Sequence, residues 1–402
     1  MERYDVIILG GGLVGLTLAL ALDQGGLSVA VVDPQPNIVA LDERFDGRAS
    51  AIASASWRMF EQLGFAGMLE PHACAIRRIE VRDGPSPEAL DFTVGSEEEP
   101  LGFMLENRQL RVALAKASAE KPGIRQFVPD RAVDTVRDEH GVRVTLASGA
   151  VLEGALLVAA EGRQSPTREA NGFKLAKWDY AHIAIISAFD HERDHGNVAH
   201  EIFYPAGPFA LLPLNPGTRS ALVWSVSPET AKGVLALSDR AFLAEVQKRA
   251  GSLLGTLGNI APRSSYPLNF LHTAKMVADR LALIGDAAHG MHPIAGQGLN
   301  LGLRDVAALA EVLVEGARSG LDLGDAQLLK RYETWRSFDA LTVMAATDSI
   351  NRLFGVDGKA ARSVRRFGLA AVQRFSPLKS FFMAEARGQG GDMPRLLQGM
   401  PV

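Results

Sequence analysis

Three glycines near the N-terminus have the types and spacing that bind a phosphate group. Gly10, Gly12 and Gly15 form the pattern G-x-G-x-x-G, and Asp33 follows at the end of the next apolar run. Gly10 suits a tight turn, Gly12 lets a pyrophosphate approach the backbone, and Gly15 allows close helix packing. The Asp33 carboxylate can accept hydrogen bonds from an adenosine ribose. These residues predict a dinucleotide site, and the alternative is a glycine-rich turn that serves packing alone.

A second glycine-rich segment, GDAAHGMHPIAGQGLNLGLRD, covers residues 285–305. Gly285 and Asp286 follow an apolar run, where a carboxylate can bind the hydroxyls of a ribityl chain. Taken alone, Asp286 could equally cap a turn. Residues 292–300 predict a turn that opens a helix, whose positive end can face negative charge on a flavin ring. The second segment therefore favours a flavin nucleotide, which the first segment does not distinguish from a nicotinamide nucleotide.

The elements around the first segment follow the βαβ pattern. Tyr4–Leu9 is a short apolar run, Leu13–Gln24 has the pattern of a helix, and residues 28–32 predict a second, parallel strand. Residues 6–22 carry no charge, but consecutive glycines interrupt them. This favours a strand, a turn and a helix over a signal peptide or a membrane span.

Strand patterns dominate the chain between residues 180 and 267, with one helix at Arg240–Ala250. We therefore expect an α/β protein in which an antiparallel β-sheet substrate domain is inserted into a Rossmann-like domain. A last buried strand is predicted at residues 280–284 and a long helix at 298–316. The predicted division is a discontinuous nucleotide-binding domain at residues 1–75, 101–179 and 268–340, a substrate domain at 76–100 and 180–267, and a C-terminal helical region at 341–402.

The bulk composition narrows the classes of partner. The formal net charge is −4 and charges of both signs are spread along the chain, so we expect no nucleic-acid partner. Cys74 is the only cysteine, which excludes an internal disulfide and makes the cytoplasm the default location. No metal-ligand spacing stands out, so no metal is expected.

One motif ties these features to a known family. His292–Asp305 matches, without a break, the pattern His-Pro-aliphatic-small-Gly-Gln-Gly-x-Asn-x-Gly-x-x-Asp. On this motif the chain resembles the class A flavoprotein monooxygenases, which have a p-hydroxybenzoate-hydroxylase-like fold, and within them the ubiquinone-biosynthesis hydroxylases. Further similar stretches are GRASAIASASWRMFEQLG at 47–64, ENRQLRVAL at 106–114 and PAGPFALLPL in the strand-rich region.

The resemblance implies that both segments hold FAD. By residue type alone, Arg48 would be a surface arginine and Asn107 a helix cap. The chain has Glu161-Gly162 where the family usually has Asp-Gly, which puts a nicotinamide-binding role for that segment in doubt. The implied cofactor-binding residues are Gly10, Gly12, Leu13, Val14, Gly15, Asp33, Arg48, Asn107, Val133, Gly285, Asp286, Pro293, Gly296, Gly298, Leu299 and Asn300.

The resemblance also implies the reaction. NADPH or NADH would reduce the flavin transiently, and O2 would add to it as a C4a-hydroperoxide that hydroxylates the ring of a polyprenyl phenol. No catalytic triad or carboxylate pair stands out, and this chemistry needs none. The candidate catalytic residues are His292 and Pro293, with His289 as a second candidate proton relay. The alternative is that both histidines are structural.

Residues 352–387 combine basic and apolar side chains with few acidic ones. We expect peripheral contact with the inner face of an anionic membrane or with a partner in a multi-enzyme ubiquinone-biosynthesis complex, the alternative being ordinary helices packed on the core. Other possible functions are a flavin hydroxylase or reductase of another lipid or polyketide pathway, or an FAD-stabilised scaffold. The basic residues are Arg352, Lys359, Arg362, Arg365, Arg366, Arg374, Lys379 and Arg387.

Overall fold

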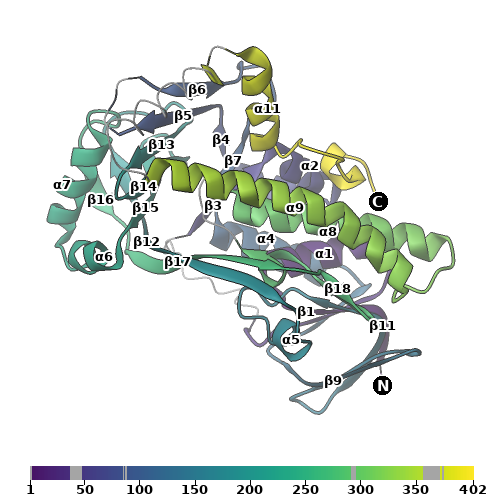
Figure 1. Cartoon of the computed structure of the whole chain (residues 1–402). Coiled ribbons are helices and arrows are strands. Elements are labelled where there is room, and N and C mark those ends of the chain that lie inside the picture. Colours follow the sequence, from purple (N-terminus) through teal and green to yellow (C-terminus); the bar gives the residue numbers. More distant parts are fainter. Residues whose placement is uncertain are drawn as a thin grey trace.

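Two large sheets, with long helices across them, make up the computed structural model of this chain (Figure 1). It describes residues 2–36, 48–84, 86, 88–290, 296–355, 372–373 and 375–402. The candidate catalytic residues His292 and Pro293, and residues 356–371 and 374 of the basic C-terminal segment, lie outside the described residues.

The first sheet is the nucleotide-binding sheet that the βαβ pattern predicts. Its central strands pair in parallel, and Val6, Ile7 and Ile8 are fully buried, as expected for a strand covered on both faces. In spatial order the strands are β18 (Val277–Ala278), β19 (Leu281–Leu283), β11 (Val151–Ala159), β1 (Glu2–Leu9), β2 (Val29–Val32) and β8 (Ile124–Phe127), with β10 (Gly141–Leu146) and β9 (Ala132–Asp138) added to β11.

Helices α1 (Leu13–Gln24), α4 (Asn107–Ala119) and α8 (Gln297–Arg318) pack against this sheet and one another. The contact between α1 and α8 depends on a glycine. A Cβ atom on Gly25 would lie 2.2 Å from a methyl carbon of Val314, so a larger residue would push the two helices apart. This packing brings the two glycine-rich segments, distant in sequence, to the same edge of the sheet.

A small three-stranded sheet lies between the two large ones. It consists of β3 (Ala49–Ala53), β7 (Gly102–Glu106) and β4 (Cys74–Ile76), followed or flanked by α2 (Ser54–Gln62), α3 (Ala66–Leu69) and η1 (Glu70–His72). Cys74 is 2% exposed and belongs to an apolar cluster with Met104 and Ala221, which connects this sheet to the second large sheet.

The second large sheet occupies the region where the sequence predicts antiparallel strands. Its outer face is covered by α6 (Pro228–Leu235) and α7 (Asp239–Ala250), whereas the pattern predicts only the second of these helices. In spatial order the strands are β20 (His289–Gly290), β17 (Ser264–Thr273), β12 (Leu175–His191), β15 (Arg219–Val226), β14 (Gly207–Leu214), β13 (Val198–Tyr204), β5 (Arg78–Asp83) and β6 (Leu90–Thr93), with β16 (Leu257–Ile260) on β12.

The prediction of a wholly antiparallel sheet is wrong at one pair. Strand β13 pairs with β5 in parallel. The long stretch of chain between these two strands provides the crossover that a parallel pair needs. Strands β12 and β17 run through the predicted boundaries at residues 180 and 268, so the chain passes between the two regions as continuous strands. The α/β fold class is confirmed, while the division into domains stays a prediction.

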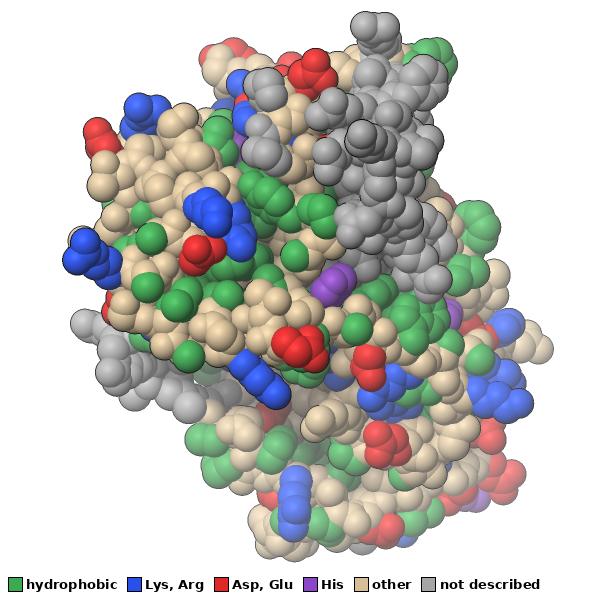
Figure 2. Space-filling model, turned by 60° about the vertical axis from the view of Figure 1, so that its left-hand side comes forward, with side chains coloured by type: hydrophobic (Ala, Val, Ile, Leu, Met, Phe, Trp, Pro, Cys, Tyr) green, Lys and Arg blue, Asp and Glu red, His purple; other side chains and the backbone are tan. Residues whose placement is uncertain are grey.

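The C-terminal part returns to the nucleotide-binding sheet. Helix α9 (Ala326–Gly355) crosses the molecule, α11 (Ser376–Ala386) follows, and η4 (Arg395–Gln398) ends on the core, where Leu396 and Leu397 are fully buried. Within the described ranges, no helix is both long and apolar enough to cross a membrane. Figure 2 shows basic and acidic side chains interspersed on one face, so no single sign of charge dominates it.

Candidate functional site

The three N-terminal glycines have two different roles. Gly10 and Gly15 allow close packing, whereas Gly12 leaves the backbone accessible to a ligand. Gly10 has φ +109°, and a Cβ atom there would lie 2.3 Å from the carbonyl oxygen of Ala160. A Cβ atom on Gly15 would lie 1.9 Å from the carbonyl oxygen of Gly10. By contrast, a Cβ atom on Gly12 would meet no described atom within 4 Å. Gly12 begins α1, so open space lies at the positive end of that helix, where a phosphate binds.

Asp33 lies beside this turn, as the spacing predicts. Its carboxylate accepts hydrogen bonds from the backbone N–H groups of Gly11 (2.6 Å) and Gln35 (2.7 Å). A carboxylate has about four acceptor positions, so it can still bind ribose hydroxyls. Val133, another predicted cofactor contact, lies on β9 with 56% of its surface exposed.

The two glycine-rich segments meet at Val14. A Cβ atom on Gly285, which has φ +58°, would lie 3.3 Å from the methyl carbons of Val14. A Cβ atom on Gly302 would lie 3.0 Å from Val14 and 3.2 Å from the Cα of Gly285. These contacts place the second segment directly against the first turn of α1.

Arg48 and Asn107 are neighbours across the small sheet. The backbone N–H of Asn107 donates to the carbonyl oxygen of Arg48 (3.0 Å), and the hydroxyl of Ser50 donates to Oδ1 of Asn107 (2.7 Å). Asn107 opens α4, so these contacts hold both predicted cofactor residues at the edge of β3.

Asn300 has a structural role that the motif alone does not reveal. Its Nδ2 donates to the carbonyl oxygen of Ala51 (2.8 Å), and its Oδ1 accepts from the backbone N–H of Ala53 (2.9 Å). Gly296, with φ +64°, lies close to the same strand, since a Cβ atom there would be 2.9 Å from the Cβ of Ala51. The side chain of Asn300 therefore fastens the start of α8 to β3, and leaves the helix N-terminus to face a bound ring.

Asp286 forms an ion pair with Arg163, with 3.0 Å between Oδ2 and Nε. Arg163 also donates to Oδ1 of Asn269 (2.9 Å) on β17. The Asp286 side chain remains 41% exposed, so it can take a further hydrogen bond from a ribityl hydroxyl. Nearby, the departure at Glu161 has a local function, because its carboxylate accepts from the Ser165 hydroxyl (2.6 Å) at the start of α5 (Pro166–Ala170).

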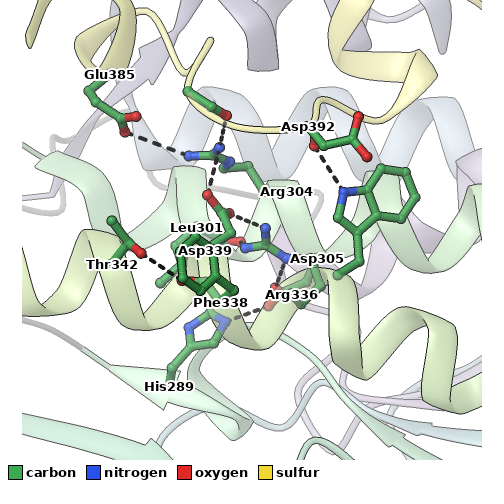
Figure 3. A network of polar contacts seen from close by, with 12 residues as sticks. His289, Leu301, Arg304, Asp305, Arg336, Phe338, Asp339, Thr342, Glu385 and Asp392 are labelled. Carbon is green, nitrogen blue, oxygen red and sulfur yellow. Dashed lines mark hydrogen bonds and ion pairs between the residues drawn. The ribbon is translucent and has the colours of Figure 1, made fainter. Parts of the chain in front are cut away.

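Behind the second segment, Asp305 is the centre of a buried polar network (Figure 3). Its Oδ2 accepts from the backbone N–H of Gly285 (2.9 Å) and lies 2.7 Å from Nε2 of His289. Its Oδ1 accepts from Nε of Arg336 (2.7 Å). Burial alone would raise the pKa of the Asp305 carboxyl, but His289 and Arg336 hold that pKa below its usual value. The geometry of His289 favours the structural alternative over a proton relay.

The network continues from α9 to the C-terminal segment. Arg336 also pairs with Asp339, which lies 2.8 Å from Arg304. Arg304 in turn donates to the carbonyl oxygen of Gly390 and lies 4.0 Å from Glu385. Sequence reasoning missed Arg336, because a single arginine in a long helix carries no signal of its burial.

Sequence reasoning also missed Tyr266, on β17. Burial raises the pKa of its phenol, and the charges of Arg163 and Arg48 oppose that shift. Arg48 is a predicted cofactor residue and Arg163 pairs with Asp286, so the end of the second sheet at Tyr266 lies near the predicted cofactor site. Within the described part of the chain, no group of three or more His, Cys, Asp or Glu side chains could hold a metal ion.

These residues fit FAD. The open backbone at Gly12 can take the pyrophosphate, Asp33 the adenosine ribose, Asp286 the ribityl chain, and the start of α8 the flavin ring. Together with the second sheet, this arrangement defines an FAD-dependent monooxygenase of the p-hydroxybenzoate-hydroxylase-like class. The roles of the individual residues, including His292 and Pro293, stay predictions.

Comparisons with known proteins agree with this class. A family model described as an FAD binding domain matches residues 3–347. The chain is 44% identical over 401 residues to "Ubiquinone hydroxylase UbiL" of Rhodospirillum rubrum, covering 99% of this chain and 93% of that protein. It is 33% identical to "3-demethoxyubiquinol 3-hydroxylase" of Escherichia coli, covering 96% and 99%. The chain therefore belongs to the ubiquinone-biosynthesis family of FAD-dependent hydroxylases.

Solved structures show the same fold at lower identity. The p-nitrophenol 4-monooxygenase PnpA of Pseudomonas putida has a TM-score of 0.78 at 18% identity, covering 98% of this chain and 100% of that one. Klebsiella pneumoniae HpxO, solved with FAD and uric acid, has a TM-score of 0.74 at 19% identity, covering 97% of each chain.

Replacing Gly12 with Ala tests whether this glycine serves cofactor binding and not folding. The added Cβ meets no described atom, so the stability of the apoprotein should change by no more than about 1 kcal/mol. It fills the space next to the backbone that a pyrophosphate would use, so FAD affinity should fall by at least ~10-fold, about 1.4 kcal/mol. Fluorescence titration of the apoprotein with FAD measures this. Gly67→Ala is the control, since its Cβ also meets nothing; equal FAD affinity of Gly12→Ala and the native protein would refute the assignment.

Replacing Asp305 with Asn tests the buried network. It removes the fully buried one of the two carboxylates that pair with Arg336 and leaves only Asp339, so the free energy of unfolding should fall by about 3 kcal/mol. The control is Glu315→Gln, which breaks a half-exposed pair with Arg331 and should change stability by less than about 1 kcal/mol. Urea unfolding of both variants measures the difference, and similar effects of the two would show that the network does not stabilise the fold.

Proposed function

We propose that this FAD-dependent hydroxylase acts on the aromatic ring of a polyprenyl phenol in ubiquinone biosynthesis, with NAD(P)H and O2 as co-substrates. The observation that carries the proposal is similarity over the whole chain to a protein named as a ubiquinone hydroxylase, at 44% identity. The second sheet supports it, because its face toward the small sheet is largely apolar and includes Val81, Leu212 and Val223, which stay partly exposed. Such a surface suits a lipid-like ring better than a charged one.

FAD, when bound, supplies the redox chemistry that activates O2. The chain's own residues bind and orient. The turn at Gly12 and the carboxylate of Asp33 hold the nucleotide half, and the start of α8, fastened by Asn300, aligns the ring system. The apolar face of the second sheet excludes water from the space in which the substrate ring lies.

Isotope incorporation tests the reaction. Purified holoprotein supplied with NADPH, a polyprenyl phenol and heavy-isotope O2 should yield a ring-hydroxylated product that carries one labelled oxygen, because the new hydroxyl comes from O2. Mass spectrometry measures the label, and fragmentation of the product identifies the ring carbon. Reduction of the substrate without labelled oxygen would indicate a reductase. FAD that NAD(P)H never reduces, with or without substrate, would indicate a scaffold.

We also propose that the C-terminal region makes peripheral contact with the inner face of an anionic membrane. Large apolar side chains on both sides of residues 356–371 are exposed: Phe338 (78%) and Leu341 (53%) before them, Phe375 (61%) and Phe381 (54%) after them. Exposed aromatic side chains beside a basic segment are typical of helices that bind at a membrane surface. Contact with another enzyme of a ubiquinone-biosynthesis complex is the alternative use of the same side chains.

Vesicle flotation tests the membrane contact. The double variant Phe375→Ser and Phe381→Ser should float with anionic vesicles at least several-fold less than the native protein, because each exposed ring contributes roughly 1.5–3 kcal/mol when buried in lipid. The control is Val136→Ser with Leu321→Ser, which removes exposed apolar side chains elsewhere on the surface. A deletion of the tail is unsuitable, since Leu396 and Leu397 belong to the core. Equal flotation of both double variants would exclude the contact.

A further inference from the structure

One carboxylate lies in the middle of the apolar face of the second sheet. Side chains alternate between the two faces of a strand, so paired residues across neighbouring strands share a face. Glu201 on β13 pairs with Val81 on β5 and with Ala210 on β14. Ala210 pairs in turn with Val223 on β15. Glu201 therefore belongs to a row whose other members are apolar.

This row faces the cofactor site. The alternate residues, including Ile202, Phe209 and Trp224, pack on the opposite face with residues of α6 and α7. On the side of Glu201, Ala199 and Leu212 pack in one apolar cluster with Ala51 of β3. Ala51 is the residue against which Gly296, at the start of α8, lies. Glu201 therefore lies on the face of the sheet that packs toward the small sheet and the start of α8.

Glu201 has no hydrogen-bond or ion-pair partner among the residues that the structure describes. Burial raises the pKa of its carboxyl to about 8. By contrast, the acid on the other face of the sheet has charged partners. Glu80 on β5 pairs with Arg82 and lies 3.2 Å from His200, the residue before Glu201 in the chain. An unpaired carboxyl in apolar surroundings is destabilising, so its presence calls for a ligand.

Several side chains around Glu201 on the inner face are partly exposed. Val81, Glu201, Leu212 and Val223 keep intermediate exposure, whereas their outer-face neighbours such as Ile202 and Trp224 are almost fully buried. The partly exposed Glu201 carboxyl is therefore accessible to a small molecule. Other ionisable groups on this face include Asp83, one row along on β5, and Tyr266, on β17 at the far side of the sheet. The ion pair of Asp190 and Arg219 lies two rows away, on β12 and β15.

We propose that Glu201 binds the ring hydroxyl of the phenol substrate and thereby orients the ring toward the flavin turn. This rests on the proposed function, which supplies the phenol. The phenol O–H donates to an oxygen of the ionised carboxylate. Glu201 makes no covalent bond, and this hydrogen bond increases the electron density at the ring positions ortho and para to the hydroxyl.

Glu201→Gln and Glu201→Ala test this, with a phenol probe and its methyl ether as ligands. The ether has the same shape but cannot donate a hydrogen bond. Binding to the holoprotein is followed by the change in flavin absorbance, which needs no turnover. In the native protein the phenol should bind more tightly than the ether. At a pH above the Glu201 pKa, both variants should weaken phenol binding by roughly 10-fold or more, as expected for a hydrogen bond to a charged group, and leave ether binding nearly unchanged.

Glu245→Gln is the matched control. It makes the same replacement in the same region, on the outer helix α7, where the carboxylate pairs with Arg249, and it should leave binding of both ligands unchanged. Glu201→Gln should retain FAD and unfold at a temperature no lower than the native protein, because it replaces a partly exposed acid in apolar surroundings by a neutral amide of similar shape. Retention of FAD and the unfolding temperature also show whether each variant is folded.

Two results would overturn the inference: unchanged preference for the phenol over its ether in both Glu201 variants, or equal weakening of phenol and ether binding. The proposed function fails separately. If the native protein binds the phenol through Glu201 but never hydroxylates a polyprenyl phenol, the reaction assignment is wrong and the binding role of Glu201 stands. If the protein hydroxylates the phenol equally well without the Glu201 carboxyl, the reaction stands and the role of Glu201 is wrong.

Discussion

A single buried carboxylate, that of Asp305, joins the flavin-side segment to the helices behind it. It accepts the backbone N–H of Gly285, contacts His289 and pairs with Arg336, all within 2.9 Å. Two helices and one turn therefore share one charge. Because a buried charge is tolerated only with its partners in place, these elements have little freedom to move independently. The buried contacts of Asp305 thus fix the relative positions of the elements that form the predicted cofactor site.

Close backbone contacts complete this support. Gly15, Gly285 and Gly302 each lie where a side chain would collide with a neighbour, and Val14 is the shared neighbour of the last two. Gly12 differs from these three, because a Cβ atom there would meet no described atom within 4 Å. The first region of the chain is therefore built to hold a cofactor in one position. The second sheet differs, because its largely apolar inner face carries a partly exposed acid, Glu201, for which we propose a substrate-binding role.

Much of the fold was predictable because its signals are local. The βαβ unit, the strand-rich region and the long helix after the second segment are confirmed, since each depends on periodicity within a short stretch. The parallel pairing of β5 with β13 and the passage of β12 through a predicted boundary were not foreseen. Strand partners and strand ends depend on segments far away in the chain, which local patterns do not encode.

The sequence by itself determined the cofactor class and the family. The reason is that the motifs at Gly10 to Gly15 and at His292 to Asp305 each lie within one short stretch of chain, so their residue types and spacing can be recognised without the fold. Only the tertiary structure decided what surrounds each side chain. Asn300 turned out to fasten α8 to β3, and Asp305 to lie at the centre of a network. In the sequence, Glu201 is one acidic residue within a predicted strand. Its apolar neighbours come from other strands that folding brings beside it. Burial and pairing therefore depend on contacts between residues that are far apart in the chain.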